Sequence, residues 1–154
     1  MPGTILTPHQ LLELIPQQKP FRFVDEILEV SDLAISGRYT FRQDESFYAG
    51  HFPGNPVTPG VILLESMCQV GVVALGIYLL AQEEAPEEVR RWTTMFADAQ
   101  TDFFKPVYPG ATVTIKGEKI FWRRKKLRSR VEMFDTAGTL VAQATASGVG
   151  VKHE

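Results

Sequence analysis

The spacing of hydrophobic positions changes along the chain and separates helical from extended stretches. Residues 7–15 carry leucine and isoleucine at helical spacing behind Thr7 and Gln10, which is typical of a helix that begins with a capping box. Apolar and polar residues then follow the pattern of two strands over 21–30 and 33–41, with polar turn residues between them. The first quarter of the chain therefore predicts a short helix followed by a pair of strands.

The longest apolar run covers residues 60–81, where polar side chains are few. Thr58 is a suitable N-cap and Pro59 a suitable first helical residue, because proline has a preset φ and no N–H to leave unpaired. The pattern predicts one long helix that begins there and ends before Pro86.

The rest of the chain is rich in alternating, β-branched and aromatic residues, broken by turn signals. An apolar helix must be covered on most of its sides. The element order therefore predicts an α+β fold, a curved antiparallel sheet around one central helix, in a single domain over 1–154. Within the helix, Gly71 and Gly76 predict places where a neighbouring element approaches closely. The four strands expected after the helix cover residues 91–104, 111–122, 127–134 and 139–151.

Composition and charge exclude several classes of protein. The chain is 44% hydrophobic and 22% charged with a net charge of −2, unlike the basic footprint of a nucleic-acid-binding protein. Cys68 is the only cysteine, which excludes an internal disulfide and favours a reducing cytoplasm; in its apolar setting it is expected to be a core residue. The start of the chain lacks a signal-peptide pattern, and Glu65, Ser66 and Gln69 make the apolar run unsuited to a membrane span.

The beginning of the long helix is the first candidate for chemistry. Gly60 and Val61 would be its second and third residues, whose N–H groups have no partner within the helix. Gly60 has no side chain to shield these donors, so a ligand can approach them. Free amides at a helix N-terminus favour negative charge and can act as an oxyanion hole.

Three polar side chains extend this candidate site. Glu65 and Gln69 follow Val61 at four-residue spacing, so all three share one helix face. An apolar environment is expected to raise the pKa of Glu65, as suits a general acid, and Gln69 can hydrogen-bond the carboxyl group or a water. His51, in a loop rich in proline and glycine, is a candidate general base. Taken singly, His51 is compatible with a structural role and Glu65 with pairing to an arginine; together the groups fit proton abstraction next to a carbonyl.

The segment HFPGNPVTPGVILLESMCQ, residues 51–69, resembles the signature of the FabZ-type (3R)-hydroxyacyl-[acyl-carrier-protein] dehydratases. Similarity extends to IPQQKPFRFVDEILEV, to FFKPVYPGATVTI and to GTLVAQATASGVGV, so it covers most of the chain. The resemblance implies a hotdog fold and the dehydration of 3-hydroxyacyl thioesters on acyl carrier protein to trans-2-enoyl thioesters. Chemistry by side chains and helix amides requires no metal, the sequence contains no His/Cys/Asp cluster with ligand spacing, and no cofactor is expected.

The resemblance also implies roles and an assembly. The family forms dimers, often hexamers built as trimers of dimers, with each active site shared between two chains. By this likeness His51 removes the α-proton, while Glu65 of the other chain protonates the leaving hydroxyl. The amides of Gly60 and Val61 hold the thioester carbonyl, and Gln69 positions the glutamate or a water.

Some positions depart from the family pattern and leave the substrate open. Gln17 and Gln18 stand where the family commonly has His-Arg, and Ala111 replaces the usual Asp after Pro-Gly. The acyl length and the pathway, primary fatty-acid synthesis or a specialised one, stay undetermined. Expected lining residues of an acyl tunnel are Val70, Val73, Tyr78 and Phe103.

A basic run begins between the second and third of the four strands expected after the long helix. It is compatible with a solvated hairpin turn or with a docking patch for an acidic carrier protein; nucleic-acid binding is disfavoured because no stacking aromatic set accompanies it. Two other functions stay open beside the dehydratase, an acyl-thioester hydrolase and a non-catalytic acyl-binding subunit. The basic residues are Arg123, Arg124, Lys125, Lys126, Arg128 and Arg130.

Overall fold

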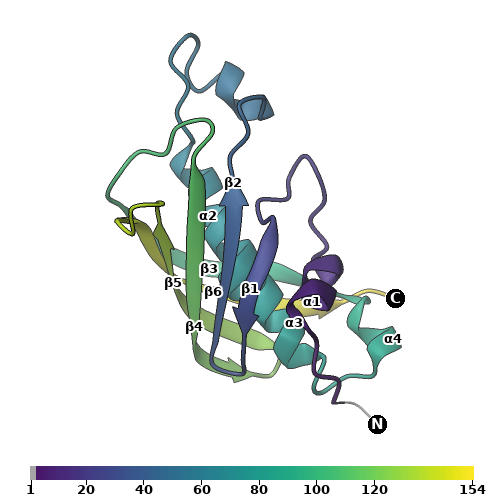
Figure 1. Ribbon diagram of the computed structural model, residues 1–154. Coiled ribbons are helices and arrows are strands. Elements are labelled where there is room, and N and C mark those ends of the chain that lie inside the picture. The colour runs from purple at the N-terminus through teal and green to yellow at the C-terminus, as the bar shows by residue number, and fades with distance from the viewer. Residues whose placement is uncertain (1–2) are drawn as a thin grey trace.

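A computed structural model describes residues 3–154 and contains one six-stranded antiparallel sheet curved around a central helix (Figure 1). The sheet order is β1-β2-β4-β5-β6-β3, so β1 and β3 are the two edges. This confirms the predicted α+β architecture. The strands are β1 (Glu26–Val30), β2 (Ala34–Thr40), β3 (Trp92–Phe103), β4 (Thr112–Arg123), β5 (Lys126–Phe134) and β6 (Leu140–Lys152).

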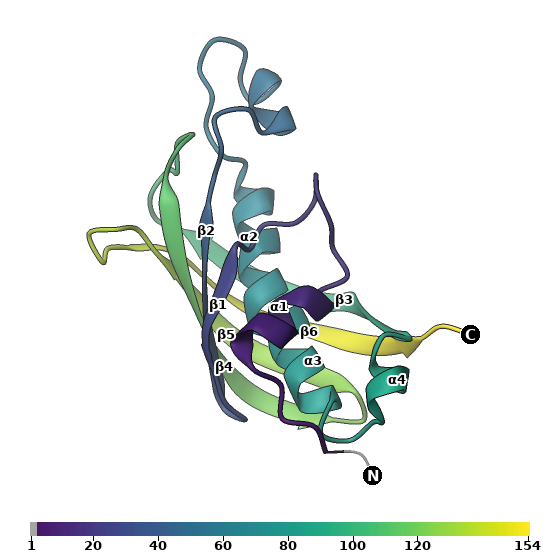
Figure 2. The same ribbon diagram turned by 45° about the vertical axis from the view of Figure 1, so that its right-hand side comes forward.

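The central helix runs from Gly60 to Leu80 and lies in the concave face of the sheet (Figure 2). It comprises α2 (Gly60–Cys68), a π-helical segment (Gln69–Ala74) and α3 (Leu75–Leu80). In length and composition it could cross a membrane, but 72% of its most apolar 18-residue stretch is buried in the protein. It is therefore the core helix of this fold, as the polar residues within it indicated.

Both ends of this helix differ from the sequence prediction. The helix begins at Gly60 with Pro59 as its cap, and the Thr58 hydroxyl bonds the Tyr48 hydroxyl at 2.6 Å instead of a helix N–H. The predicted cap was wrong because a tertiary partner outcompeted the local one. At the other end the helix stops at Leu80, and a separate turn, α4 (Pro86–Val89), follows.

The shorter elements cover the remaining side. The helix α1 (Pro8–Leu14) begins with the predicted capping box, in which Thr7 and Gln10 bond each other's backbone N–H. It packs beside α3 and β1, over the side of the central helix that the sheet leaves open (Figure 2).

The helix and the sheet pack closely at Gly71. A Cβ atom there would lie 2.4 Å from Cγ2 of Val131, and one at Gly117 would lie 2.9 Å from the Gly71 Cα atom. The predicted close approach is thus confirmed at Gly71. It was wrong at Gly76, where a Cβ would meet only Leu127, at an ordinary 3.8 Å.

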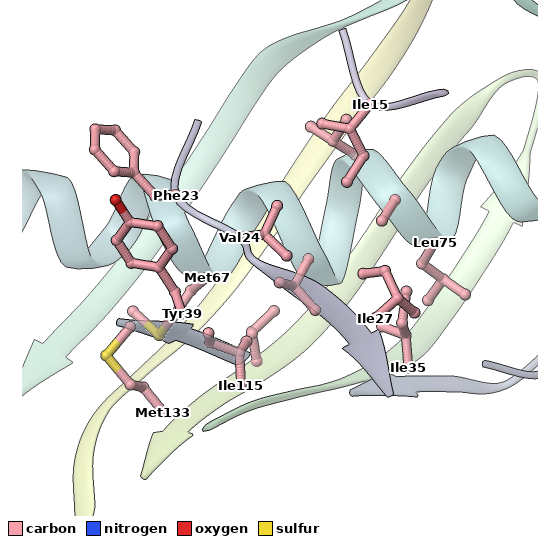
Figure 3. Packing of buried hydrophobic residues seen from close by; sticks show 14 of the residues in the cluster. Ile15, Phe23, Val24, Ile27, Ile35, Tyr39, Met67, Leu75, Ile115 and Met133 are labelled. Carbon is pink, nitrogen blue, oxygen red and sulfur yellow. The ribbon is translucent and has the colours of Figure 1, made fainter. Parts of the chain in front are cut away.

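The core fills the space between the helix and the sheet (Figure 3). Met67 and Leu75 project from the helix toward Ile35, Ile115 and Met133 of the strands, and all five are buried. Strands β2 and β5 bury every second residue, so one face of the sheet forms the core there and the other is more exposed, whereas the edge strand β3 has no buried residue.

Candidate active site

Gln69 ties the helix to the segment that precedes β1. Its side chain is fully buried: Oε1 accepts the Phe23 N–H at 2.7 Å, and Nε2 donates to the Phe21 carbonyl at 2.8 Å. The neighbouring Ser66 hydroxyl donates to the Phe23 carbonyl at 2.7 Å. These bonds explain why the predicted strand over 21–30 starts only at Glu26, because helix side chains occupy the backbone groups of residues 21–23.

The same carboxamide holds Glu65. Gln69 Nε2 also donates to Glu65 Oε2 at 2.9 Å, which confirms that the two side chains share a helix face and contact each other. Burial raises the pKa of Glu65, and the bond from Gln69 opposes part of that rise. Within residues 3–154 no protein donor bonds the other carboxyl oxygen, and Glu65 lines the adjacent pocket.

That pocket has a volume of about 250 Å³ and lies between the central helix and strands β3 and β6. Cys68 lines it, but burial, followed by the negative charge of Glu65, raises the pKa of its thiol, so a thiolate nucleophile is disfavoured. Of the predicted tunnel residues only Val73 lines this pocket; Val70 packs against Gly37 of β2 instead. The lining residues are Gln17, Phe21, Glu65, Cys68, Val72, Val73, Thr94, Phe96 and Gly148.

Gln17 is a member of the pocket that sequence reasoning did not assign to the site. Its Oε1 atom is buried and accepts no hydrogen bond in the described part of the chain. Its departure from the family pattern was visible in the sequence, but its place beside Glu65 depends on how the 15–25 segment folds back over the helix.

The helix N-terminus offers the two free donors expected from the sequence. The N–H groups of Ile62 and Leu63 both donate to the Pro59 carbonyl, whereas those of Gly60 and Val61 have no acceptor within residues 3–154. A Cβ atom at Gly60 would lie 3.1 Å from the Phe103 ring, so glycine leaves more space between this ring and the helix amides than any other residue would. The Val61 side chain is 73% exposed, so among residues 3–154 this side of the helix end is left largely uncovered.

His51 lies on the segment between β2 and α2, which projects beyond the end of the sheet (Figure 1). Backbone bonds close the turn around it, from Val57 N–H to the His51 carbonyl at 3.0 Å and between Phe52 and Asn55. The ring Nδ1 lies 2.9 Å from the Val57 carbonyl, which can only accept, so Nδ1 carries the proton. Nε2 is therefore the basic nitrogen, as proton abstraction requires.

One chain does not bring His51 and Glu65 together. His51 is absent from the lining of the Glu65 pocket, and no hydrogen bond or ion pair joins the two residues among the described part of the chain. No group of three potential metal-ligating side chains occurs in residues 3–154.

The basic run forms the tip of the β4–β5 hairpin and the start of β5. Arg124 and Lys125 have positive φ angles of 52° and 62°, as a two-residue hairpin turn requires. Lys125 bonds Glu83 at 2.7 Å and Arg128 bonds Asp98 at 2.9 Å, so part of the charge is neutralised. The hairpin tip lies beside the C-terminal end of α3, at the far end of the helix from Gly60.

Comparisons with known proteins define the class of this site. Among solved structures, a dehydratase heterocomplex, ApeI:P, from Xenorhabdus doucetiae matches with a TM-score of 0.73, 15% identity and coverage of 96% of this chain and 93% of that one. A thioesterase from Haemophilus influenzae matches with a TM-score of 0.68, 16% identity and coverage of 98% and 94%. At such identities the likeness establishes the fold, and the fold is the hotdog fold.

The family is fixed by sequence. The model of the FabA-like domain matches residues 15–145, and the chain belongs to this family. A 3-hydroxyacyl-[acyl-carrier-protein] dehydratase FabZ from Herpetosiphon aurantiacus is 36% identical over 141 residues, covering 90% of this chain and 94% of that protein. A FabZ from Methylobacterium sp. is also 36% identical, over 152 residues, with coverage of 93% and 89%.

Proposed function

We propose that this protein is a lyase that dehydrates 3-hydroxyacyl thioesters carried on acyl carrier protein. We further propose that it consists of a single domain and acts in the cytoplasm. The observation that carries the proposal is Glu65, a carboxyl group with a raised pKa that Gln69 holds on the face below two free helix amides. The relatives named as FabZ dehydratases support the same reaction. The thioesterases among the structural neighbours share only the fold.

The proposed reaction uses each group once. His51 Nε2 takes the α-proton while the amides of Gly60 and Val61 stabilise the charge that develops on the thioester oxygen. The bond from the β-carbon to oxygen then breaks, and Glu65 gives its proton to the departing hydroxyl, which leaves as water. The product is the trans-2-enoyl thioester, and transfer of the abstracted proton back to Glu65 completes the cycle.

The proposal requires two copies of the chain, with His51 from one and Glu65 from the other. Two observations support this. His51 does not reach its own Glu65 pocket, and β3 is an edge strand with its backbone free for pairing along one side. Apolar side chains stay exposed along and beside this edge, as expected for a surface that a second copy covers. They are Met95, Phe96, Phe103 and Phe104.

The basic hairpin is a separate part of the proposal. The central helix spans 21 residues, or about 30 Å at 1.5 Å per residue, between the amides and the hairpin. Docking of the carrier protein by Arg123 to Arg130 therefore stays a prediction, as does a hexamer. Replacing Arg124 and Lys126 by glutamate tests the docking: KM for the carrier-bound substrate should rise with kcat preserved.

The reaction itself is tested with purified protein and a (3R)-hydroxyacyl carrier protein. The proposal expects the ultraviolet absorbance of a conjugated enoyl thioester to rise, with no free thiol released. Release of thiol without the enoyl signal would favour the hydrolase. No product of either kind would favour a non-catalytic acyl-binding subunit.

A further inference from the structure

The Glu65 pocket continues along one stripe of the central helix and then closes. Glu65, Cys68, Val72 and Gly76 follow one another along the helix at spacings of three or four residues, so they share the face that looks toward β3 and β6. The pocket of about 250 Å³ includes the first three of these residues. A second cavity of only about 20 Å³ begins at Val72 and includes Gly76.

Three residues line both cavities and therefore separate them: Val72, Thr94 and Gly148. A Cβ atom at Gly148 would lie 2.5 Å from Cγ2 of Thr94 and 2.7 Å from Cγ1 of Val72. The two methyl groups thus meet over the bare backbone of the glycine. Such contacts leave no room for a hydrocarbon chain between them.

The small cavity is closed in turn at its far end. Glu83 accepts hydrogen bonds from Trp122 Nε1 at 2.5 Å and from Lys125 Nζ at 2.7 Å, and both donors belong to residues that line the cavity. An acyl chain that passed the partition would reach this charged cluster after a short distance. Burial of its apolar end against charged groups would not stabilise binding.

We infer that the partition of Val72, Thr94 and Gly148 sets the acyl length, so that the enzyme prefers short and medium chains; this inference rests on the proposed function. The β-carbon reacts at Glu65, and Val72 lies seven positions further along the helix, or about 10 Å along its axis. An extended hydrocarbon advances about 1.25 Å per bond, from a bond of about 1.5 Å and an angle of about 111°. About eight bonds therefore fit beyond the β-carbon, which is the third carbon, and turnover falls for chains longer than about eleven carbons.

The test is the dependence of kcat/KM on acyl length, measured with even-numbered 3-hydroxyacyl carrier proteins from short to long. Val72→Ala removes part of the partition and opens room for about two further methylene groups. Each buried methylene contributes roughly a factor of four, so kcat/KM for the first length that wild type rejects should rise about sixteenfold. The readout is the ratio of kcat/KM for that length to kcat/KM for a short chain within the same protein, and this ratio should rise by the same factor.

Val70→Ala is the matched control, because it deletes the same atoms from a buried valine on the same helix. Val70 faces Gly37 on β2 and does not line either cavity. Its variant should keep the wild-type length profile. Thr94→Ser is a milder second variant that removes only the Cγ2 methyl at the partition, and it should shift the profile in the same direction by about fourfold.

Equal turnover of long and short chains by wild type would overturn the inference while leaving the dehydratase intact. Identical profiles for Val72→Ala, Thr94→Ser and Val70→Ala would do the same. Failure of the wild-type protein to dehydrate any length would reject the proposed function, and this inference with it.

Discussion

Replacing Gln69 by leucine tests whether this side chain both holds the fold and tunes the acid. Leucine has a similar size and suits a buried helix position, but it removes all three hydrogen bonds of the carboxamide. The buried Phe23 N–H loses its acceptor, the Phe21 carbonyl loses a donor and Glu65 loses the bond that stabilises its ionised form.

The magnitude follows from which groups stay buried. A buried donor without an acceptor costs about 1–3 kcal/mol, and the partly exposed Phe21 carbonyl can recover a water. We expect Gln69→Leu to lower the free energy of unfolding by about 2–3 kcal/mol. The pKa of Glu65 should rise further, because only burial then acts on it.

Two assays separate these effects. Urea unfolding gives the stability loss, and the pH dependence of kcat gives the pKa of the acid. Because Glu65 must be protonated to act, its ionisation defines the alkaline limb, and that limb should move to higher pH in Gln69→Leu. The rate at its optimum should fall roughly 10- to 100-fold, since the carboxyl group is no longer held in place.

Ser66→Ala serves as the control. It removes one hydrogen bond to the same backbone segment, at Phe23, without touching Glu65. It should cost about 1 kcal/mol and leave the alkaline limb where it is. An alkaline limb that moved equally in both variants, or in neither, would refute the reasoning.

Three further predictions concern the acid, the amides and the edge strand. Because burial raises the pKa of Glu65, the folded state binds its proton more tightly than the unfolded chain, and wild type loses stability as pH rises through the folded pKa. The free energy of unfolding of Glu65→Gln should therefore exceed that of wild type at alkaline pH, and this difference should vanish below about pH 4. A difference that stayed constant with pH would contradict burial of Glu65 as the cause. Gly60→Ala should lower kcat/KM about tenfold, because the added methyl contacts the Phe103 ring beside the helix amides. Circular dichroism should show that the fold is retained. An unchanged kcat/KM would contradict a role of Gly60 in the site. Met95→Lys should reduce the assembly in light scattering and lower activity with it, because it places a charge on the exposed apolar edge; an unaltered mass would exclude that edge as the interface.

The sequence predicted what depends on local spacing. The long helix, its free amides at Gly60 and Val61, and the shared face of Glu65 and Gln69 all follow from residues within a few turns of one another, and the structure places them so. The alternation of apolar and polar residues in the later strands could be recognised in the sequence as well. The predicted strands over 111–122 and 127–134 agree with β4 and β5 within one or two residues.

What the sequence did not predict depends on distant partners or on irregular backbone. Thr58 hydrogen-bonds Tyr48 instead of capping the helix. The segment before β1 hydrogen-bonds Gln69 and Ser66 instead of extending the strand. The π-helical segment Gln69–Ala74 changes which side chains face the pocket. Regular spacing suggested Val70, Val73 and Tyr78; of these only Val73 lines the pocket, and Val72, which was not predicted, lines it as well.

The most direct test of the central claim mixes two inactive variants. His51→Ala and Glu65→Gln should each lose about 10²-fold or more in kcat when assayed alone. If each site takes His51 from one copy and Glu65 from the other, hybrids formed after unfolding and refolding together contain one intact site, and the mixture should recover about a quarter of wild-type dehydration. A mixture as inactive as its two components, with hybrids shown by mass spectrometry, would contradict the shared site. Full activity of either variant alone would contradict the proposed roles themselves.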